Sequence, residues 1–309
     1  MSDPAINEPR RILRRVQKHL SQTQLNLGTL RESIGLVDVV YHPTNTHPLL
    51  NYVTPRNNTA WIPAPEIKKG LDRLRDLKRA PRITYIEGLY PPLFAKAIRE
   101  LNMVVEQETA ILTYRIDEAQ LAERKRIPVK LPVEFRMETA DKQEHSVVWW
   151  YLWKKAGASS LVRSIEPLSI GRAAQDPDQG SQINLIFYEG KSPIGVARLT
   201  IHKNNAYIPA LAMTQTARTQ DKMTLLYRVV MDLAWQYDCT LVFTSEDVES
   251  DHQLCRDMGF IDSGSVVRYV ERTDLQTPGK DRVDEEMAQS VFALRESKPS
   301  KTKDEPGAT

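Results

Sequence analysis

Residues 213–223, MTQTARTQDKM, form the polar junction of this chain whose charged residues and position best suit the binding of a phosphate group. A strand-like apolar run enters this junction and an amphipathic helix leaves it. The first N–H groups of a helix have no partner within the helix, so a strand–loop–helix junction is a common place for phosphate. Arg218 and Lys222 add two positive charges, whereas Asp221 adds a negative one. Three interpretations are open: the junction binds phosphate, it has lost an earlier ability to bind phosphate, or it is an ordinary connection.

The elements on either side of the junction can be read from their patterns. Residues 204–212, NNAYIPALA, predict a strand, and the β-branched run 240–246, TLVFTSE, predicts a central strand that is buried on both sides. Gly259 is expected to end the following helix at its C-cap. The helix between the two strands is predicted from one apolar face, formed by Met223, Leu226, Val230, Leu233, Ala234 and Tyr237.

The first half of the chain repeats this order. Residues 57–65, NNTAWIPAP, match 204–212 and predict a strand, with Trp61 corresponding to Tyr207 and Pro63 to Pro209. The pattern of helix, strand, helix and strand that follows is the same in both halves. It predicts an internal duplication in which the second copy carries the extra stretch LAMTQTARTQ before its helix.

These patterns predict an α/β protein with two tandem units, each a mixed sheet flanked by helices. The charged, proline-containing stretch DEAQLAERKRIPVKLP predicts a linker between them. The predicted parts are a basic amphipathic helix at 1–24, a truncated first unit at 25–116, the linker at 117–131, a second unit at 132–272, and a C-terminal segment with a disordered tail at 273–309.

The second half resembles the GNAT superfamily of acyl-CoA-dependent N-acyltransferases over about residues 133–271. The resemblance rests on INLIFYEGKSPIGVARLTIHKNNAYIPALAM, LVFTSEDVESDHQLCRDMGF and GSVVRYVE. Residues 25–115, and PRITYIEGLYPPLFAKAIRELNM in particular, resemble the abbreviated N-terminal copy of tandem members. The resemblance implies two GNAT-like units, of which the first has a structural role.

The same resemblance implies acetyl-CoA or another acyl-CoA as cofactor, without a metal. In that superfamily a glycine-rich turn after the fourth strand receives the pyrophosphate, because backbone N–H groups must approach it closely. The glycine positions fall here on Gln220 and Lys222, or on Asp221 and Met223, and no glycine occurs between Gly195 and Gly259. The cofactor-binding residues implied are Met213, Arg218, Thr219, Gln220, Lys222 and Met223.

Three residues are candidates for proton transfer. Cys255 stands where the superfamily often has a tyrosine as general acid, and the alternative is a cysteine that only packs. Glu246 is a candidate base acting through water, or else a capping or surface carboxylate, and Tyr207 is a second candidate base. The resulting prediction is acyl transfer to a small-molecule or protein amine; the alternative is a catalytically degenerate binding or scaffold protein.

Two helical stretches leave alternatives open. RRILRRVQKHL places arginines on one arc and Ile12, Leu13, Val16 and Leu20 on the other. This helix either binds an anionic partner or docks its apolar stripe on the body with its arginines in solvent. VVWWYLWKK could line an acceptor pocket, or could fill the contact between the two halves.

Composition narrows the remaining possibilities. The formal net charge of +2 excludes a globally basic nucleic-acid binder. Two cysteines are too few for a disulfide framework or a cysteine zinc site, which suggests a cytoplasmic protein, and no membrane span is expected. His42 and His47 lie five apart in a Pro- and Asn-containing loop without an obvious third metal ligand.

Overall fold

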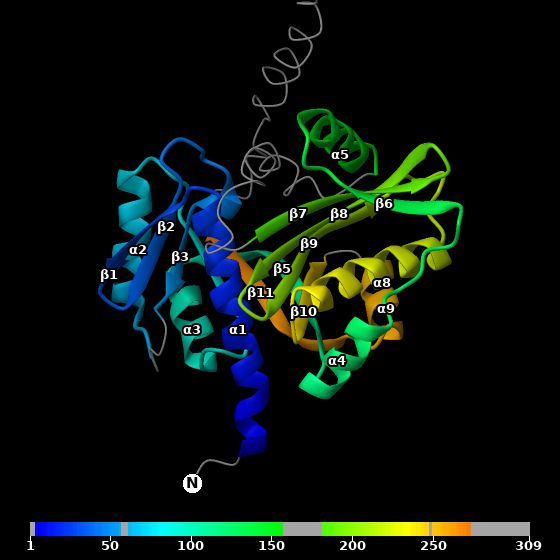
Figure 1. Cartoon of the computed structure of the whole chain (residues 1–309). Coiled ribbons are helices and arrows are strands. Elements are labelled where there is room, and N and C mark those ends of the chain that lie inside the picture. Colours follow the sequence, from blue (N-terminus) through cyan, green and yellow to red (C-terminus); the bar gives the residue numbers. More distant parts are fainter. Residues whose placement is uncertain (1–3, 57–60, 157–180, 247–248, 273–309) are drawn as a thin grey trace, which may run out of the picture. The chain divides into compact units, whose positions relative to one another are not determined.

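A computed structural model describes residues 4–56, 61–156, 181–246 and 249–272, all within a body that spans Met1–Leu275 (Figure 1). Helix α1 (Pro4–Asn26) precedes the first half. Among the described residues, no helix combines the length and the apolar character needed to cross a bilayer. The first half contains β1 (Leu30–Ile34), β2 (Val37–Tyr41), a 3-10 turn (Pro48–Leu50), β3 (Tyr52–Pro55), α2 (Ala64–Asp76), β4 (Arg82–Ile86), α3 (Pro92–Glu100) and β5 (Met103–Arg115).

The second half follows helix α4 (Glu118–Arg126), which lies inside the predicted linker and begins with a capping box of Asp117 and Gln120. Its elements are β6 (Phe135–Thr139), α5 (Gln143–Lys155), β7 (Ser181–Glu189), β8 (Ser192–His202), β9 (Asn205–Met213), α8 (Gln220–Gln236), β10 (Leu241–Glu246), α9 (Glu249–Asp257) and β11 (Ile261–Glu271). The predicted C-terminal segment at 273–309 lies outside the described residues.

All strands form one 11-stranded mixed sheet in the order β1-β2-β3-β4-β11-β5-β10-β9-β8-β7-β6. The two predicted sheets are therefore joined. The last strand of each half inserts into the other half: β11 pairs with β4, β5 pairs with β10, and all these contacts are antiparallel. β5 and β11 also pair with each other from Ile261↔Thr113 to Glu271↔Met103. Each half thus completes the sheet of the other.

The predicted repetition of element order is confirmed, because β1-β2-β3-α2-β4-α3-β5 matches β7-β8-β9-α8-β10-α9-β11. The predicted register is wrong. The counterpart of β9 is β3 (Tyr52–Pro55), while Trp61 is exposed and Pro63 is the N-cap of α2. Pro63 and Pro65 lack the N–H that a strand ladder needs and suit the first turn of a helix. The connection from β3 to α2 therefore runs from Pro55 to Ala64, and that from β9 to α8 runs from Met213 to Gln220, so the second copy has no insertion there. Residues 57–60 of the first connection lie outside the described residues.

Close contact between α2 and the sheet depends on a glycine. A Cβ atom at Gly70 would lie 2.9 Å from Val37 Cγ2 and 3.0 Å from Val53 Cγ1. Gly259 has a φ of 92° and ends α9, as predicted, because this left-handed conformation favours glycine. The backbone therefore selects glycine for two different reasons, close approach at α2 and chain reversal after α9.

Three tryptophans lie on α5, and their placement differs from both predicted alternatives. Trp149 and Trp153 stack with their centroids 5.7 Å apart and are buried against β7, β8 and β9. Trp149 Nε1 donates a hydrogen bond to the Ala197 carbonyl at 3.0 Å. These two rings fill the contact between α5 and the sheet of its own half, whereas the contact between the halves consists of paired strands and α1.

Helix α1 docks its apolar stripe, as predicted by one of the two alternatives. Leu13 and Val16 are buried in the core of the first half, and Ile12 and Leu20 pack at its edge. Not all of the basic residues stay in solvent: Arg15 donates through Nε to Asn205 Oδ1 at 2.7 Å and through Nη2 to Thr240 Oγ1 at 3.1 Å. The helix therefore contacts both halves.

This packing predicts the effect of Leu13→Ala. The change should lower the free energy of unfolding by about 2–5 kcal/mol, because it removes a buried side chain and leaves a cavity under α1. Urea unfolding measures the change. Lys18→Ala on the exposed face of the same helix is the control and should shift stability by no more than about 0.5 kcal/mol. Equal stability of the two variants would show that α1 does not dock as described.

Candidate functional site

The candidate site begins where β9 and β10 separate. The two strands pair in parallel from Leu241↔Asn205 to Thr244↔Ile208, after which β9 continues to Met213 alongside β8 alone. A register shift between β8 and β9 falls near Pro209, which has no N–H to donate. In open α/β sheets, ligands bind beyond the carboxyl ends of parallel strands where neighbouring strands lead apart. The second half has such a place at this point.

The junction 214–219 is held by its own hydrogen bonds. Thr214 N donates to the Ile194 carbonyl at 2.8 Å, and the amides of Ala217 and Arg218 donate to the Thr214 carbonyl at 3.0 and 2.9 Å. Thr219 caps α8 by accepting a hydrogen bond from Lys222 N at 3.3 Å. The junction thus forms a tight turn that leads into a capped helix without any glycine.

Both cations of the junction have carboxylate partners. Arg218 forms an ion pair with Asp251, whose side chain is 10% exposed, and Lys222 Nζ lies 2.8 Å from Glu189 Oε2. Asp221 adds an exposed carboxylate in the first turn of α8. The cations that would attract an anion are therefore already neutralised, and the local charge favours anions less than the sequence suggested.

The structure gathers the predicted cofactor-binding residues at one place, but not all of their side chains point outward. Arg218, Thr219 and Gln220 are exposed at the start of α8. Met213 and Met223 are buried in the core of the second half, with exposed fractions of 0% and 2%. These two residues can offer only main-chain groups to a ligand.

The catalytic candidates do not converge. Tyr207 lies on β9, where its hydroxyl is 2.7 Å from Ser245 Oγ and its ring stacks on Phe243. Cys255 on α9 is fully buried in the core cluster that lies under α8, whereas Tyr207 packs with the cluster that includes α1. The sheet therefore separates the thiol from the phenol. Glu246 ends β10, and its side chain lies outside the described residues.

A buried histidine that sequence reasoning missed lies close to Tyr207. His19 of α1 is 1% exposed, and its Nε2 lies 2.9 Å from Thr200 Oγ1. Its ring makes edge contacts with those of Tyr207 and Phe243, with centroids 6.0 and 5.1 Å apart. Burial, reinforced by nearby His202, lowers the pKa of His19 to about 3. The sequence feature that could have predicted this burial is the position of His19 three residues after Val16, on the apolar face of the helix.

The other histidine pair shapes a loop. His42 Nδ1 accepts hydrogen bonds from the amides of Thr44 and Asn45 at 3.2 and 2.9 Å, and His47 Nδ1 accepts one from Leu49 N at 3.2 Å. Over the described ranges, no three His, Cys, Asp or Glu side chains come together as a metal site would require. Cys239 and Cys255 are both buried, and no disulfide joins them.

The arrangement matches known structures in fold. A GCN5-related N-acetyltransferase from Kribbella flavida is 14% identical with a TM-score of 0.62, and the match covers 86% of this chain and 97% of that one. A GCN5-related N-acetyltransferase from Sphaerobacter thermophilus is 12% identical with a TM-score of 0.54, and the match covers 77% and 81%. A tandem GNAT protein from the clavulanic acid biosynthesis pathway is 14% identical with a TM-score of 0.51, and the match covers 82% and 94%.

These similarities establish that the chain has the GNAT fold in a tandem arrangement. No family model matches the sequence. No curated protein matches it either. At such low identity the fold is shared, whereas the chemistry has to be argued from this chain's own residues.

The environment of His19 predicts how stability depends on pH. The folded protein keeps this ring neutral, while the unfolded chain takes up a proton as pH falls below about 6.5. The free energy of unfolding should therefore decrease as the pH is lowered from about 6.5 to about 3. At pH 5 the decrease due to His19 should be about 2 kcal/mol. His202, whose pKa burial also lowers, acts in the same direction.

Urea unfolding at pH 8 and pH 5 measures this dependence. His19→Gln keeps a polar, uncharged side chain and removes the titrating imidazole, so the dependence of stability on pH should be weaker than in the native protein. The carboxylates elsewhere titrate equally in both proteins and cancel in the comparison. An unchanged pH profile in the variant would mean that His19 is not buried as described.

Proposed function

We propose that the second half is an acyl-CoA-dependent N-acyltransferase that transfers an acetyl or other acyl group to an amine. The observation that carries the proposal is the separation of β9 from β10 beside the start of α8, within a GNAT fold. This geometry presents main-chain N–H groups at a helix start next to an open strand end, which suits a pyrophosphate and a carbonyl respectively.

The chain's own residues would have the following roles. The amides of Thr219, Gln220 and Asp221, with the side chains of Arg218 and Lys222, would hold the pyrophosphate. The amides of 218, 222 and 223 already donate to Thr214 and Thr219. Amides near Met213 at the end of β9 would polarise the thioester carbonyl. Tyr207, whose hydroxyl is hydrogen-bonded to Ser245, would accept the amine proton, or Glu246 would do so through water. Bound acyl-CoA would supply the activated acyl group. Cys255 is too enclosed to donate a proton to a leaving thiolate, so its role is packing.

The main-chain groups fit this cofactor better than the side chains do. Arg218 and Lys222 can contact a pyrophosphate only if they leave Asp251 and Glu189. Exposed ion pairs contribute little, about 0–1 kcal/mol, so the pair of Lys222 with half-exposed Glu189 exchanges easily. Asp251 is nearly buried, so it holds Arg218 more firmly. The proposal therefore implies weak cofactor binding in the native protein.

One set of observations favours a second function, a GNAT-fold binding or scaffold protein without acyl transfer. The cations of the junction are neutralised, the turn has no glycine, and the thiol that replaces the usual tyrosine is enclosed. An anionic partner would then meet the exposed basic residues of α1, which include Arg11 and Lys18. Under either function we place the protein in the cytoplasm, because its two cysteines are buried and form no disulfide with each other.

The ion pairs provide the test. Glu189→Gln and Asp251→Asn each release one cation and should strengthen binding of free CoA and acetyl-CoA, measured by calorimetry, by about tenfold if the released cation reaches a phosphate. Arg218→Ala with Lys222→Ala should weaken it by well over tenfold, since a charged contact contributes about 1.5–3 kcal/mol.

Asp238→Asn is the matched control, because it breaks the ion pair of Asp238 with Lys125 near the opposite end of α8. It should leave CoA binding unchanged. If all variants and the native protein fail to bind CoA at millimolar concentration, the acyltransferase proposal fails and the scaffold function stands. Tight native binding that the double alanine variant retains would place the cofactor elsewhere.

A further inference from the structure

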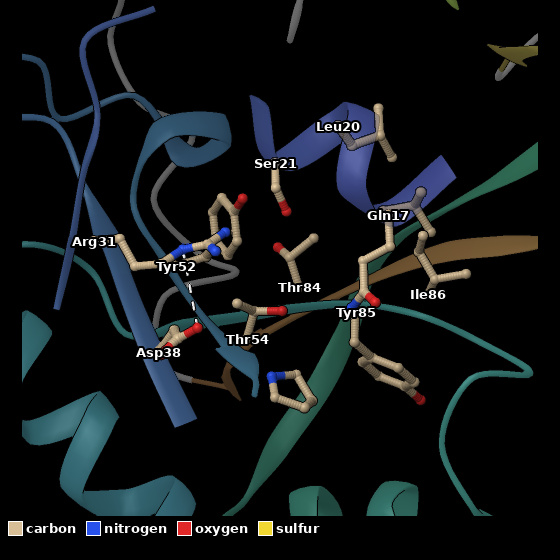
Figure 2. A pocket seen from close by; sticks show the side chains of 12 residues that line it. Gln17, Leu20, Ser21, Arg31, Asp38, Tyr52, Thr54, Thr84, Tyr85 and Ile86 are labelled. Carbon is tan, nitrogen blue, oxygen red and sulfur yellow. Dashed lines mark ion pairs between the residues drawn. The ribbon is translucent and has the colours of Figure 1, made fainter. Parts of the chain in front are cut away.

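A small pocket lies in the first half, between α1 and the sheet (Figure 2). Its volume is about 60 Å³, which corresponds to roughly four water-sized groups. Strands β1, β2, β3, β4 and β11 form one side, and Gln17, Leu20 and Ser21 of α1 form the other. The parallel strands β3 and β4 are paired at Val53↔Ile83 alone. The pocket therefore lies where these two strands of the first half separate.

The wall of this pocket combines hydroxyl groups, an arginine and an apolar patch. Figure 2 shows the side chains of Ser21, Thr54 and Thr84 directed into the space beneath α1. Arg31 lies at one side, where its Nε is 3.9 Å from Asp38 Oδ2. Burial raises the pKa of Tyr52 to about 12, so its phenol keeps its proton and can donate a hydrogen bond. The apolar patch consists of Leu20, Ile86 and Val266.

One hydroxyl of the wall is buried without a partner. Thr84 Oγ1 is enclosed and makes no hydrogen bond within the described part of the chain. A buried polar atom normally has a partner, because leaving it unsatisfied costs about 1–3 kcal/mol. A ligand with an oxygen acceptor in the pocket would satisfy this hydroxyl.

A buried guanidinium lies beside the same wall, on the face of the sheet that Thr84 shares. Arg268 is the cross-strand neighbour of Thr84 and is 7% exposed. Its Nη1 donates to Gln107 Oε1 at 2.8 Å, its Nε has no hydrogen-bond partner, and no carboxylate oxygen of the described residues lies within 4 Å of it. Glu106, the nearby acid, already forms a bidentate contact with Arg82 at 3.0–3.1 Å. Glu106 offsets part of the charge of Arg268 through space but does not contact it. Since a buried charge without a contacting counter-charge is costly, this wall favours a negative ligand.

We propose that this pocket binds a short-chain carboxylate. The carboxylate would lie against Thr84 and Tyr52, in the field of Arg268, and the alkyl part would rest on Leu20, Ile86 and Val266. Asp38 also lines the pocket, and its charge is offset by Arg31 and Arg56. The volume limits the bound group to a few heavy atoms, which suits a free short-chain acid or the carboxylate end of a longer molecule. The proposal concerns the first half and does not depend on acyl transfer in the second.

Propionate and propionamide provide the test, because they have nearly the same shape and differ in charge. Calorimetry on the full chain should show millimolar binding of propionate and at least about tenfold weaker binding of propionamide. Hexanoate should bind if the site accepts the end of a longer molecule, whereas its failure would restrict the site to free short acids. Equal binding of propionate and propionamide, or tighter binding of inorganic phosphate, would overturn the proposal.

Two variants locate the site. Thr84→Val removes the partnerless hydroxyl at nearly constant shape and should weaken propionate binding several-fold without loss of stability. Arg268→Met removes the uncompensated charge and should abolish binding while the melting temperature stays the same or rises. Thr29→Val is the matched control, because Thr29 Oγ1 is also buried with no hydrogen-bond partner among the described residues but lies outside the pocket. Native affinity in both pocket variants, or no binding of propionate to the native protein, would refute the assignment.

Discussion

The exchange of closing strands between the halves is the constraint on which the rest of the structure depends. β5 lies between β11 and β10, and β11 lies between β4 and β5, so the hydrogen bonds of each closing strand are satisfied by both halves. Separating the halves would expose backbone groups of β4, β5, β10 and β11, and such edges pair readily with other chains. The crossing also fixes where the parallel pairs β3·β4 and β9·β10 can separate, one on each side of the exchanged strands. Each separation becomes a candidate place for a ligand.

Helix α1 reinforces this arrangement on one face of the sheet. Its apolar stripe packs on the first half, and Arg15 and His19 reach the second half through Asn205, Thr240 and Thr200. The same two turns supply Gln17, Leu20 and Ser21 to the pocket of the first half. One amphipathic helix thus closes a pocket in one half and buries an uncharged histidine beside Tyr207 in the other. A change in how this helix sits would alter both environments together.

The sequence predicted well those features that local patterns determine. The long strands, the helix after the junction and the Gly259 cap follow from periodicity and from backbone preference, which act over a few residues. The register of the first half could not be predicted in the same way. NNTAWIPAP looks like NNAYIPALA, but its prolines direct it into a helix start, and the short run Tyr52–Pro55 takes the strand position instead. The exchange of β5 and β11 between the halves could not be predicted from the sequence either, because pairing between distant strands leaves no local pattern.

The candidate site shows the same division between what is local and what is not. The sequence placed Arg218 and Lys222 at a helix start, but their carboxylate partners are 33 residues away in each case, on α9 and on β7. For Arg268 the distant neighbours have the opposite effect: its strand partners bring an amide and a hydroxyl, and the nearby acid Glu106 contacts Arg82, so no carboxylate of the described residues contacts Arg268. Whether a cation can serve a ligand depends on such partners and on burial, because only an uncompensated charge in a dry environment exerts a strong field. By that criterion Arg268 suits an anion better than Arg218 or Lys222 does, because carboxylates contact those two side chains and none of the described residues brings one into contact with Arg268. The half that the sequence assigned a purely structural role therefore carries the stronger electrostatic signal for a ligand.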